Sequence, residues 1–395
     1  MIAGLLLDWE KGGISVNRKA LVITYHVKEC KRVGGFHQFI SFLTDDGFDV
    51  DWFTNTVSSA WIWHRNDREN VRNFFRLLKG FSFTEKNVMV RQFTVPIWIP
   101  AKVAKYVNDE LYNHYWPSWK KIRKKLQNQY DVILVEGPGA QYVLELRRDY
   151  PDSKLIYRPS DVLCTYTKIS DANEIEKRMI ANADVTYCVD ENQMQFYRQI
   201  GGDKSKLKIL RNPLISQKQI EEFQTYHPSC SANPCVIYIG VSGVDLDCIE
   251  YAANKNKDIP FVVVGPFSRN SHDNITYTGV LTEPLFTPYL QNAAVGIEPL
   301  VDNFDQIKVG YTRKVIRYMR YLLPVVVTRH ENYRNVKGFI NAVGYDDFSN
   351  KVKEAYKMTM KERYGLKDGY NELFKSFSNE EVRHRFDAAV LKGVY

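Results

Sequence analysis

Two series of short, mostly apolar runs, several of them closed by glycine, proline or an acidic residue, constrain the fold of this chain most. The first series is Ala20–Tyr25, Phe48–Phe53, Asp131–Val135, 154–157 and Ala183–Val189. The second series is Val236–Ile239, Phe261–Val264, Ile275–Tyr277, Ala294–Ile297, Pro324–Val327 and Phe339–Val343. Runs that are apolar along their whole length are typical of strands buried on both faces of a parallel sheet.

Segments with helical spacing separate these runs, among them His37–Leu43, Gln141–Tyr150 and Tyr311–Leu322. Strands that alternate with helices predict a doubly wound parallel sheet with right-handed crossovers. Neither series carries G-x-G-x-x-G at its first turn. Two such domains resemble the GT-B nucleotide-sugar transferases. The predicted fold class is therefore α/β, with two doubly wound Rossmann-like domains facing across a cleft.

A chain of 395 residues exceeds what one core needs, which agrees with two domains. We expect an extension at 1–17, an acceptor- and membrane-binding domain at 18–211, a linker at 212–234, a nucleotide-sugar-binding domain at 235–375 and a helix at 376–395 that crosses back to the first domain. Residues 65–127 are expected to be mostly helical, with a break from Pro96 to Pro100. No apolar run approaches the roughly 20 residues that span a bilayer, and Ile2–Leu7 lacks the features of a signal peptide.

The six cysteines form no C-x-x-C pair, which argues against a zinc ribbon or a disulfide scaffold and fits a reducing cytoplasm. Asp49-Val50-Asp51 and Asp245-Leu246-Asp247 match the two-carboxylate pattern of metal-dependent sugar transferases. The first lies inside a predicted strand and the second opens a predicted helix, so we interpret both as structural. No metal and no other cofactor is expected.

Basic residues alternate with tyrosines and tryptophans across 101–130. This pattern suits an anionic membrane surface or nucleic acid, and a solvated helix face with its aromatics in the core is the structural alternative. The membrane-facing candidates are Trp116, Trp119, Lys120, Lys121, Arg123 and Lys124.

Ligands of doubly wound sheets bind beyond the carboxyl ends of the strands, and Asp161 follows the strand predicted at 154–157. A carboxylate there can deprotonate an acceptor hydroxyl as it attacks a sugar. Ser160 or Asp161 can equally cap the helical segment that follows. Glu136, on the neighbouring strand end, is the rival base. His26 and His37 are candidates for ordering the cleft or contacting the acceptor.

The second series offers two candidate phosphate sites. Small residues after its first strand, Gly240, Val241, Ser242 and Gly243, would let a phosphate approach the backbone. Thr312, Arg313 and Lys314 begin a helix whose amides and dipole favour phosphate, and Arg317 shares a face with Lys314. A basic solvated face is the alternative for that helix.

Residues 131–165, DVILVEGPGAQYVLELRRDYPDSKLIYRPSDVLCT, resemble the xanthan-type inverting glucuronosyltransferases, and the similarity extends to ALVITYH at 20–26 and to the Arg313-Lys314 helix start. The resemblance implies a membrane-associated GT-B enzyme that uses a UDP-sugar and a polyprenyl-diphosphate-linked oligosaccharide. It implies that Asp161 is the base and that Gly240–Gly243, Val280, Leu281, Thr312, Arg313 and Lys314 contact the nucleotide. The family has an acid and a methionine where Val280 and Leu281 stand, and a methionine where Arg313 stands. Arg313 would suit the carboxylate of glucuronate.

We therefore predict an inverting, UDP-sugar-dependent glycosyltransferase in polysaccharide assembly, peripheral on the cytoplasmic face of the cell membrane and without a nucleic-acid partner. Three alternatives stay open. They are a retaining GT-B transferase, a GT-B-shaped nucleotide-sugar epimerase and a nucleic-acid-binding protein. The retaining mechanism usually shows a pair of glutamates near the last nucleotide helix, and Glu298 has no acidic partner near Val309–Arg317.

Overall fold

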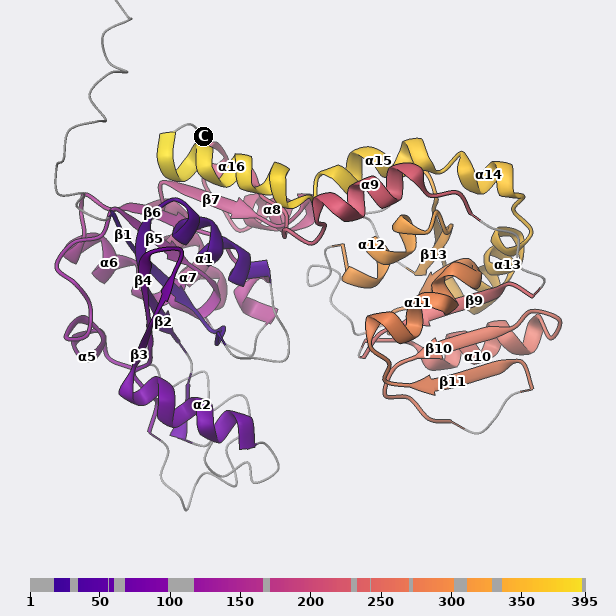
Figure 1. Cartoon of the computed structure of the whole chain (residues 1–395), viewed down its shortest axis with the longest axis horizontal. Coiled ribbons are helices and arrows are strands. Elements are labelled where there is room, and N and C mark those ends of the chain that lie inside the picture. Colours follow the sequence, from indigo (N-terminus) through magenta and orange to yellow (C-terminus); the bar gives the residue numbers. More distant parts are fainter. Residues whose placement is uncertain are drawn as a thin grey trace, which may run out of the picture. The chain divides into compact units, whose positions relative to one another are not determined.

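The computed structural model describes residues 18–28, 35–55, 57–59, 68–98, 117–165, 171–228, 233–241, 243–269, 273–301, 311–328 and 336–392. Internal contacts divide the chain into two compact units, which Figure 1 shows with their helices and strands. The N-terminal unit is Met1–Tyr157 with Asn182–Asp184, and the C-terminal unit is Arg158–Ala181 with Val185–Tyr395.

An eight-stranded sheet has the order β3-β4-β2-β1-β5-β6-β7-β8. Its strands are β1 (Arg18–Thr24), β2 (Phe48–Thr54), β3 (Phe81–Glu85), β4 (Val88–Phe93), β5 (Val132–Val135), β6 (Lys154–Tyr157), β7 (Val185–Cys188) and β8 (Leu207–Ile209). The intervening helices are α1 (Gly35–Asp45), α2 (Arg68–Lys79), α5 (Trp119–Arg123), η2 (Gly137–Tyr142), α6 (Val143–Asp149), η3 (Leu163–Thr165), α7 (Ala172–Asn182), α8 (Glu191–Gln199) and η4 (Lys204–Lys206). All predicted strands of the first series are present, and β3, β4 and β8 were not predicted.

The hairpin of β3 and β4 corrects the expectation that residues 65–127 are mostly helical. β3 runs antiparallel to β4, which adds to the sheet beside β2. Lys86 and Asn87 connect the two strands with positive φ angles of 50° and 69°. Two consecutive residues of this kind match the right-handed twist of a hairpin, and the aromatic and β-branched residues on either side favour strands.

A six-stranded parallel sheet, in the order β11-β10-β9-β12-β13-β14, forms the core of the C-terminal part. Its strands are β9 (Cys235–Ile239), β10 (Phe261–Val264), β11 (Ile275–Gly279), β12 (Ala293–Glu298), β13 (Val325–Thr328) and β14 (Phe339–Ala342). The helices are α9 (Gln217–Thr225), α10 (Leu246–Lys255), α11 (Glu283–Asn292), α12 (Arg313–Arg320), α13 (Gly344–Tyr356), α14 (Met360–Tyr364), α15 (Lys367–Lys375) and α16 (Asn379–Lys392).

Alternate residues of these strands face two separate cores. Ile237 and Ile239 pack with α9, α11, α12 and α15, whereas Val236 and Tyr238 pack with α10 and α13. Helices therefore cover both faces of the sheet, which explains why strands such as β9 and β10 are apolar along their whole length. The architecture is the predicted two-sheet, Rossmann-like GT-B fold.

The segment predicted as a linker contributes α9 to the C-terminal core. Ser216 caps this helix in a capping box with Gln219, and Ile220 and Phe223 are buried. α16 occupies the predicted final helix. In the part of the chain that the structure describes, no helix has the length and apolar character to cross a bilayer.

Candidate functional site

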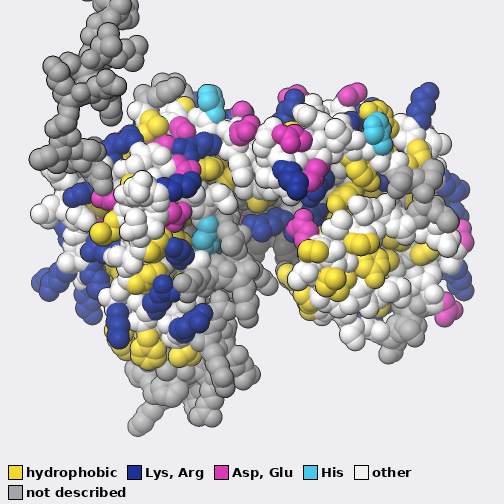
Figure 2. Space-filling view, in the orientation of Figure 1, with side chains coloured by type: hydrophobic (Ala, Val, Ile, Leu, Met, Phe, Trp, Pro, Cys, Tyr) yellow, Lys and Arg dark blue, Asp and Glu magenta, His cyan; other side chains and the backbone are white. Residues whose placement is uncertain are grey.

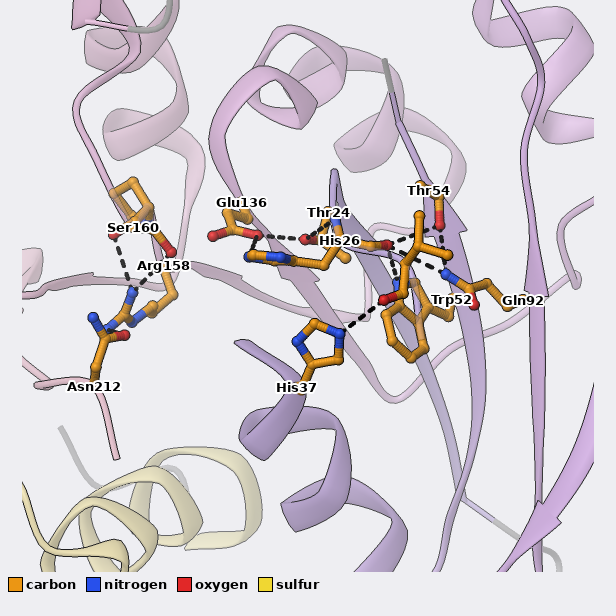
Figure 3. Close-up of polar contacts among 12 residues, drawn as sticks. Thr24, His26, His37, Trp52, Thr54, Gln92, Glu136, Arg158, Ser160 and Asn212 are labelled. Carbon is orange, nitrogen blue, oxygen red and sulfur yellow. Dashed lines mark hydrogen bonds and ion pairs between the residues drawn. The ribbon is translucent and has the colours of Figure 1, made fainter. Parts of the chain in front are cut away.

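A buried acid and a histidine lie close together where β1 and β5 end (Figure 3). Glu136 follows β5 and is fully buried, and Thr24, the last residue of β1, donates its hydroxyl to Glu136 Oε2. His26 Nε2 lies 3.5 Å from the same oxygen. A carboxylate that holds one ring nitrogen orients the imidazole and leaves the other nitrogen available to a substrate. The structure thus brings together His26 and Glu136, two of the predicted acceptor-side residues.

The backbone that carries His26 is fixed by side chains from three other elements. The carbonyl oxygen of His26 accepts three hydrogen bonds, from Trp52 Nε1 at 3.1 Å, Thr54 Oγ1 at 3.1 Å and Gln92 Nε2 at 3.3 Å. His37, on α1, places Nε2 2.9 Å from the carbonyl oxygen of Val27. His37 therefore orders the chain just beyond β1, one of the two roles predicted for it.

Asp161, the predicted base, lies in the bend between β6 and η3 and is partly exposed. Arg158, at the start of this loop, is fully buried and donates to Asn212 Oδ1 at 2.7 Å. Arg158 was not predicted as a site residue. A sequence signal for it is an arginine directly after an apolar strand, where a buried charge needs hydrogen-bond partners.

The loop after β9 depends on glycine at the predicted phosphate site. A Cβ on Gly240 would lie 2.2 Å from the hydroxyl of Tyr238, so no other residue fits without a shift. Gly243 has a φ of +70°, which favours glycine. Val241 is 51% exposed and Ser242 lies outside the described residues. The role of this loop in phosphate binding stays a prediction.

At the start of α12, Lys314 forms an ion pair inside the protein. Its Nζ lies 3.2 Å from Glu298 Oε1, with the Lys314 side chain 11% exposed and that of Glu298 fully buried. Thr312, the N-cap of α12, also donates to Glu298 Oε1 at 2.8 Å. Burial opposes the charged ammonium most strongly, but the charge of Glu298, the hydroxyl of Tyr238 and the hydrogen bonds to both together outweigh it and raise the pKa of Lys314 above its ordinary value. Lys314 is therefore charged, and Glu298 balances much of that charge.

Other predicted donor-side residues are accessible to a ligand. Arg313 is exposed, and Arg317 Nη2 binds Glu283 at 3.0 Å. Val280 is 70% exposed after Gly279, whose φ is +73°. Leu281 is partly exposed and packs against the core.

The structure shows part of the basic surface that the sequence predicts around α5. Lys120, Lys121 and Lys124 are exposed, and Figure 2 shows basic side chains over the region of the N-terminal unit where α5 lies. The prediction that Trp119 faces a membrane is wrong, because this side chain is 8% exposed and donates to Asp149 Oδ2 at 2.6 Å. Arg123 is half-buried. Trp116 lies outside the described residues.

Acids of both two-carboxylate patterns have partners within the protein. Asp51 is buried and pairs with Arg91 at 2.6 Å, and Asp245 caps α10 by accepting from the amide of Cys248 at 2.9 Å. Within the described ranges, no three His, Cys, Asp or Glu side chains are placed to hold a metal ion.

Residues 22–189 match a family model described as the N-terminal domain of glucuronosyltransferase GumK. No curated protein matches the chain. Among solved structures, the apo form of OtsA is 10% identical, with a TM-score of 0.63 over 94% of this chain and 99% of that chain. Sucrose-phosphate synthase from Thermosynechococcus elongatus is 13% identical, with a TM-score of 0.62 over 95% and 99%. HepE of Anabaena, solved with UDP, is 11% identical, with a TM-score of 0.61 over 95% and 100%. The chain therefore shares the fold of these proteins, and its residues 22–189 are similar to the N-terminal domain of GumK.

Proposed function

We propose that this protein is an inverting glycosyltransferase that moves a sugar from a UDP-sugar to a polyprenyl-diphosphate-linked oligosaccharide in polysaccharide synthesis. The observation that carries the proposal is the match of residues 22–189 to the N-terminal domain of a glucuronosyltransferase. The exposed basic residue Arg313 at the start of α12 also supports a donor that carries a diphosphate, because a helix N-terminus favours phosphate.

In this proposal Asp161 removes the proton from the acceptor hydroxyl while the sugar leaves UDP. The N-terminal end of α12, with Arg313 and Lys314, stabilises the negative charge of the departing diphosphate, and no metal is needed. Glucuronate is the proposed donor sugar because Arg313 can bind its carboxylate. The protein would act at the cytoplasmic membrane face, where the exposed lysines of α5 contact anionic lipid.

Thermal unfolding with a nucleotide panel tests the donor. The panel is UDP, GDP, UDP-glucuronate, UDP-glucose and UDP-N-acetylglucosamine. A ligand at about 100 times its Kd stabilises by roughly 2.7 kcal/mol, which raises the Tm of a domain this size by roughly 5–11 °C. A shift with UDP and a larger one with UDP-glucuronate supports the proposal. A larger shift with UDP-glucose would replace glucuronate by glucose, and no shift with any uridine nucleotide would refute the UDP assignment.

Asp161→Asn tests the base. We expect this variant to keep the UDP shift and to lose transfer by about 10²- to 10⁴-fold, measured as labelled sugar incorporated into extractable lipid of a membrane preparation. Asp152→Asn is the matched control, since Asp152 is exposed in the turn before β6. Near-normal transfer by Asp161→Asn would remove Asp161 from the mechanism.

A further inference from the structure

Arg158 connects the loop that carries Asp161 to the segment Leu210–Asn212, which follows β8. Nη2 donates to Asn212 Oδ1 at 2.7 Å and to the carbonyl oxygen of Leu210 at 3.2 Å. Nη1 makes longer contacts to its own loop, 3.3 Å to the carbonyl oxygen of Pro159 and 3.4 Å to Ser160 Oγ (Figure 3). Because the guanidinium group is planar and rigid, these four contacts fix the loop and the segment in one geometry.

The middle residue of the same segment is fixed to the start of α12. Arg211 places its guanidinium carbon 5.1 Å from the ring centre of Tyr311 and 5.2 Å from that of Phe377. Its Nη2 binds both carboxylate oxygens of Glu191, at 2.8 and 3.1 Å. The Arg211 side chain is 10% exposed and that of Glu191 is 62% exposed, so the contacts of Arg211 with the two rings are largely shielded from water, whereas its ion pair with Glu191 is screened by water and salt.

Tyr311 is the residue before Thr312, the N-cap of α12, where the proposed function places the donor diphosphate. The contacts Tyr311–Arg211 and Asn212–Arg158 therefore form an unbroken path from the start of α12 to the loop of Asp161. Every residue on this path belongs to the C-terminal unit.

We propose that Arg158 is a positioning residue for Asp161, and that the segment Leu210–Asn212 couples nucleotide binding at the start of α12 to the geometry of the Asp161 loop. The proposal rests on the proposed function. It explains why a fully buried arginine, rather than an apolar residue, follows β6. A base displaced by about 1 Å can lose roughly 100-fold in rate, so an enzyme gains from a loop that is held and adjusted in this way.

Hydrogen exchange of peptides covering residues 158–165 tests the inference in two steps. Without ligand, Asn212→Ala removes the shortest contact of Arg158 and should speed exchange of these amides by roughly tenfold. Asn212→Asp keeps an acceptor oxygen and should exchange like the wild type. Arg198→Met is the matched control, because Arg198 is an exposed arginine on α8. Arg158→Met removes all four contacts of the guanidinium group and is therefore the more disruptive variant. If Arg158→Met does not fold, Asn212→Ala still tests the inference.

With UDP, the wild type should show slower exchange in 158–165, and Asn212→Ala should lose this protection while keeping its UDP-induced Tm shift. Its kcat should fall by roughly tenfold with the donor KM within about twofold. Unchanged exchange in unliganded Asn212→Ala, or a wild-type Tm shift with UDP that leaves 158–165 unaffected, would overturn the inference. Absence of any UDP shift would refute the proposed donor instead, while the unliganded comparison still decides the positioning role of Arg158.

Discussion

Removal of the Lys314 ammonium should destabilise the C-terminal part of the protein strongly. In Lys314→Met the side-chain volume is nearly kept, but the fully buried carboxylate of Glu298 loses the cation at 3.2 Å. Thr312 still donates to it at 2.8 Å. The hydroxyl cannot replace a full charge, so the folded state keeps a poorly compensated buried anion.

The expected loss is about 3–5 kcal/mol, the usual effect of removing one partner of a buried ion pair. The double variant Lys314→Met/Glu298→Gln should recover most of it, because a neutral amide still accepts from Thr312 and no charge remains. Arg317→Met is the control on the same helix. Arg317 and Glu283 are 28% and 44% exposed, so losing this pair should change stability by no more than about 1 kcal/mol.

Urea denaturation followed by circular dichroism at 222 nm measures the effect. With a slope of roughly 2 kcal/mol per M, the midpoint of Lys314→Met should fall by about 1.5–2.5 M. All seven tryptophans lie at or before residue 119, so tryptophan fluorescence reports the N-terminal unit and should change little. If the free energy of unfolding of Lys314→Met lies within about 1 kcal/mol of that of the wild type, the reasoning is refuted. The double variant also separates two roles of Lys314, pairing with Glu298 and binding the nucleotide. If the double variant is stable but loses its UDP-induced Tm shift, Lys314 contacts the nucleotide in addition to pairing with Glu298.

Two further predictions concern the buried acids Glu136 and Asp190. Glu136→Gln should retain the UDP shift and lower transfer by about 10- to 100-fold, because His26 loses the carboxylate that orients it; a loss larger than that of Asp161→Asn would make Glu136 the base. Burial raises the pKa of Asp190, with the amide of Gln193 and the charge of Arg211 opposing the shift. The folded state therefore binds more protons than the unfolded state, and stability falls as pH rises from the ordinary pKa of Asp190 to its raised folded value. Asp190→Asn should therefore gain stability relative to the wild type as pH rises through that window, which urea midpoints from pH 4 to 7 measure. A stability difference between the two proteins that does not vary with pH would contradict the raised pKa of Asp190.

The strands could be predicted from the sequence because buried strands are rich in apolar residues. β10 was predicted with its observed bounds, and β9, β12 and β13 within one residue at each end. A strand covered by helices on both faces needs apolar residues at every position, so its sequence differs clearly from its polar surroundings. The hairpin of β3 and β4 was missed because Phe81–Glu85 alternates exposed and partly buried residues and lies at the sheet edge, where less burial is required.

The sequence by itself determined the two-sheet architecture and the strand ends at which Glu136, Asp161 and the Gly240–Gly243 loop stand, because periodicity and glycine act locally along the chain. Only the tertiary structure decided the partners of the charged groups. His26 meets Glu136, which lies 110 residues later in the chain, Arg158 meets Asn212, and Lys314 meets Glu298. The same holds for Trp119, whose ring is buried rather than presented to a surface. The sequence does not show whether water, a lipid or another side chain surrounds a charged group or an aromatic ring. Packing in the tertiary structure decides that environment.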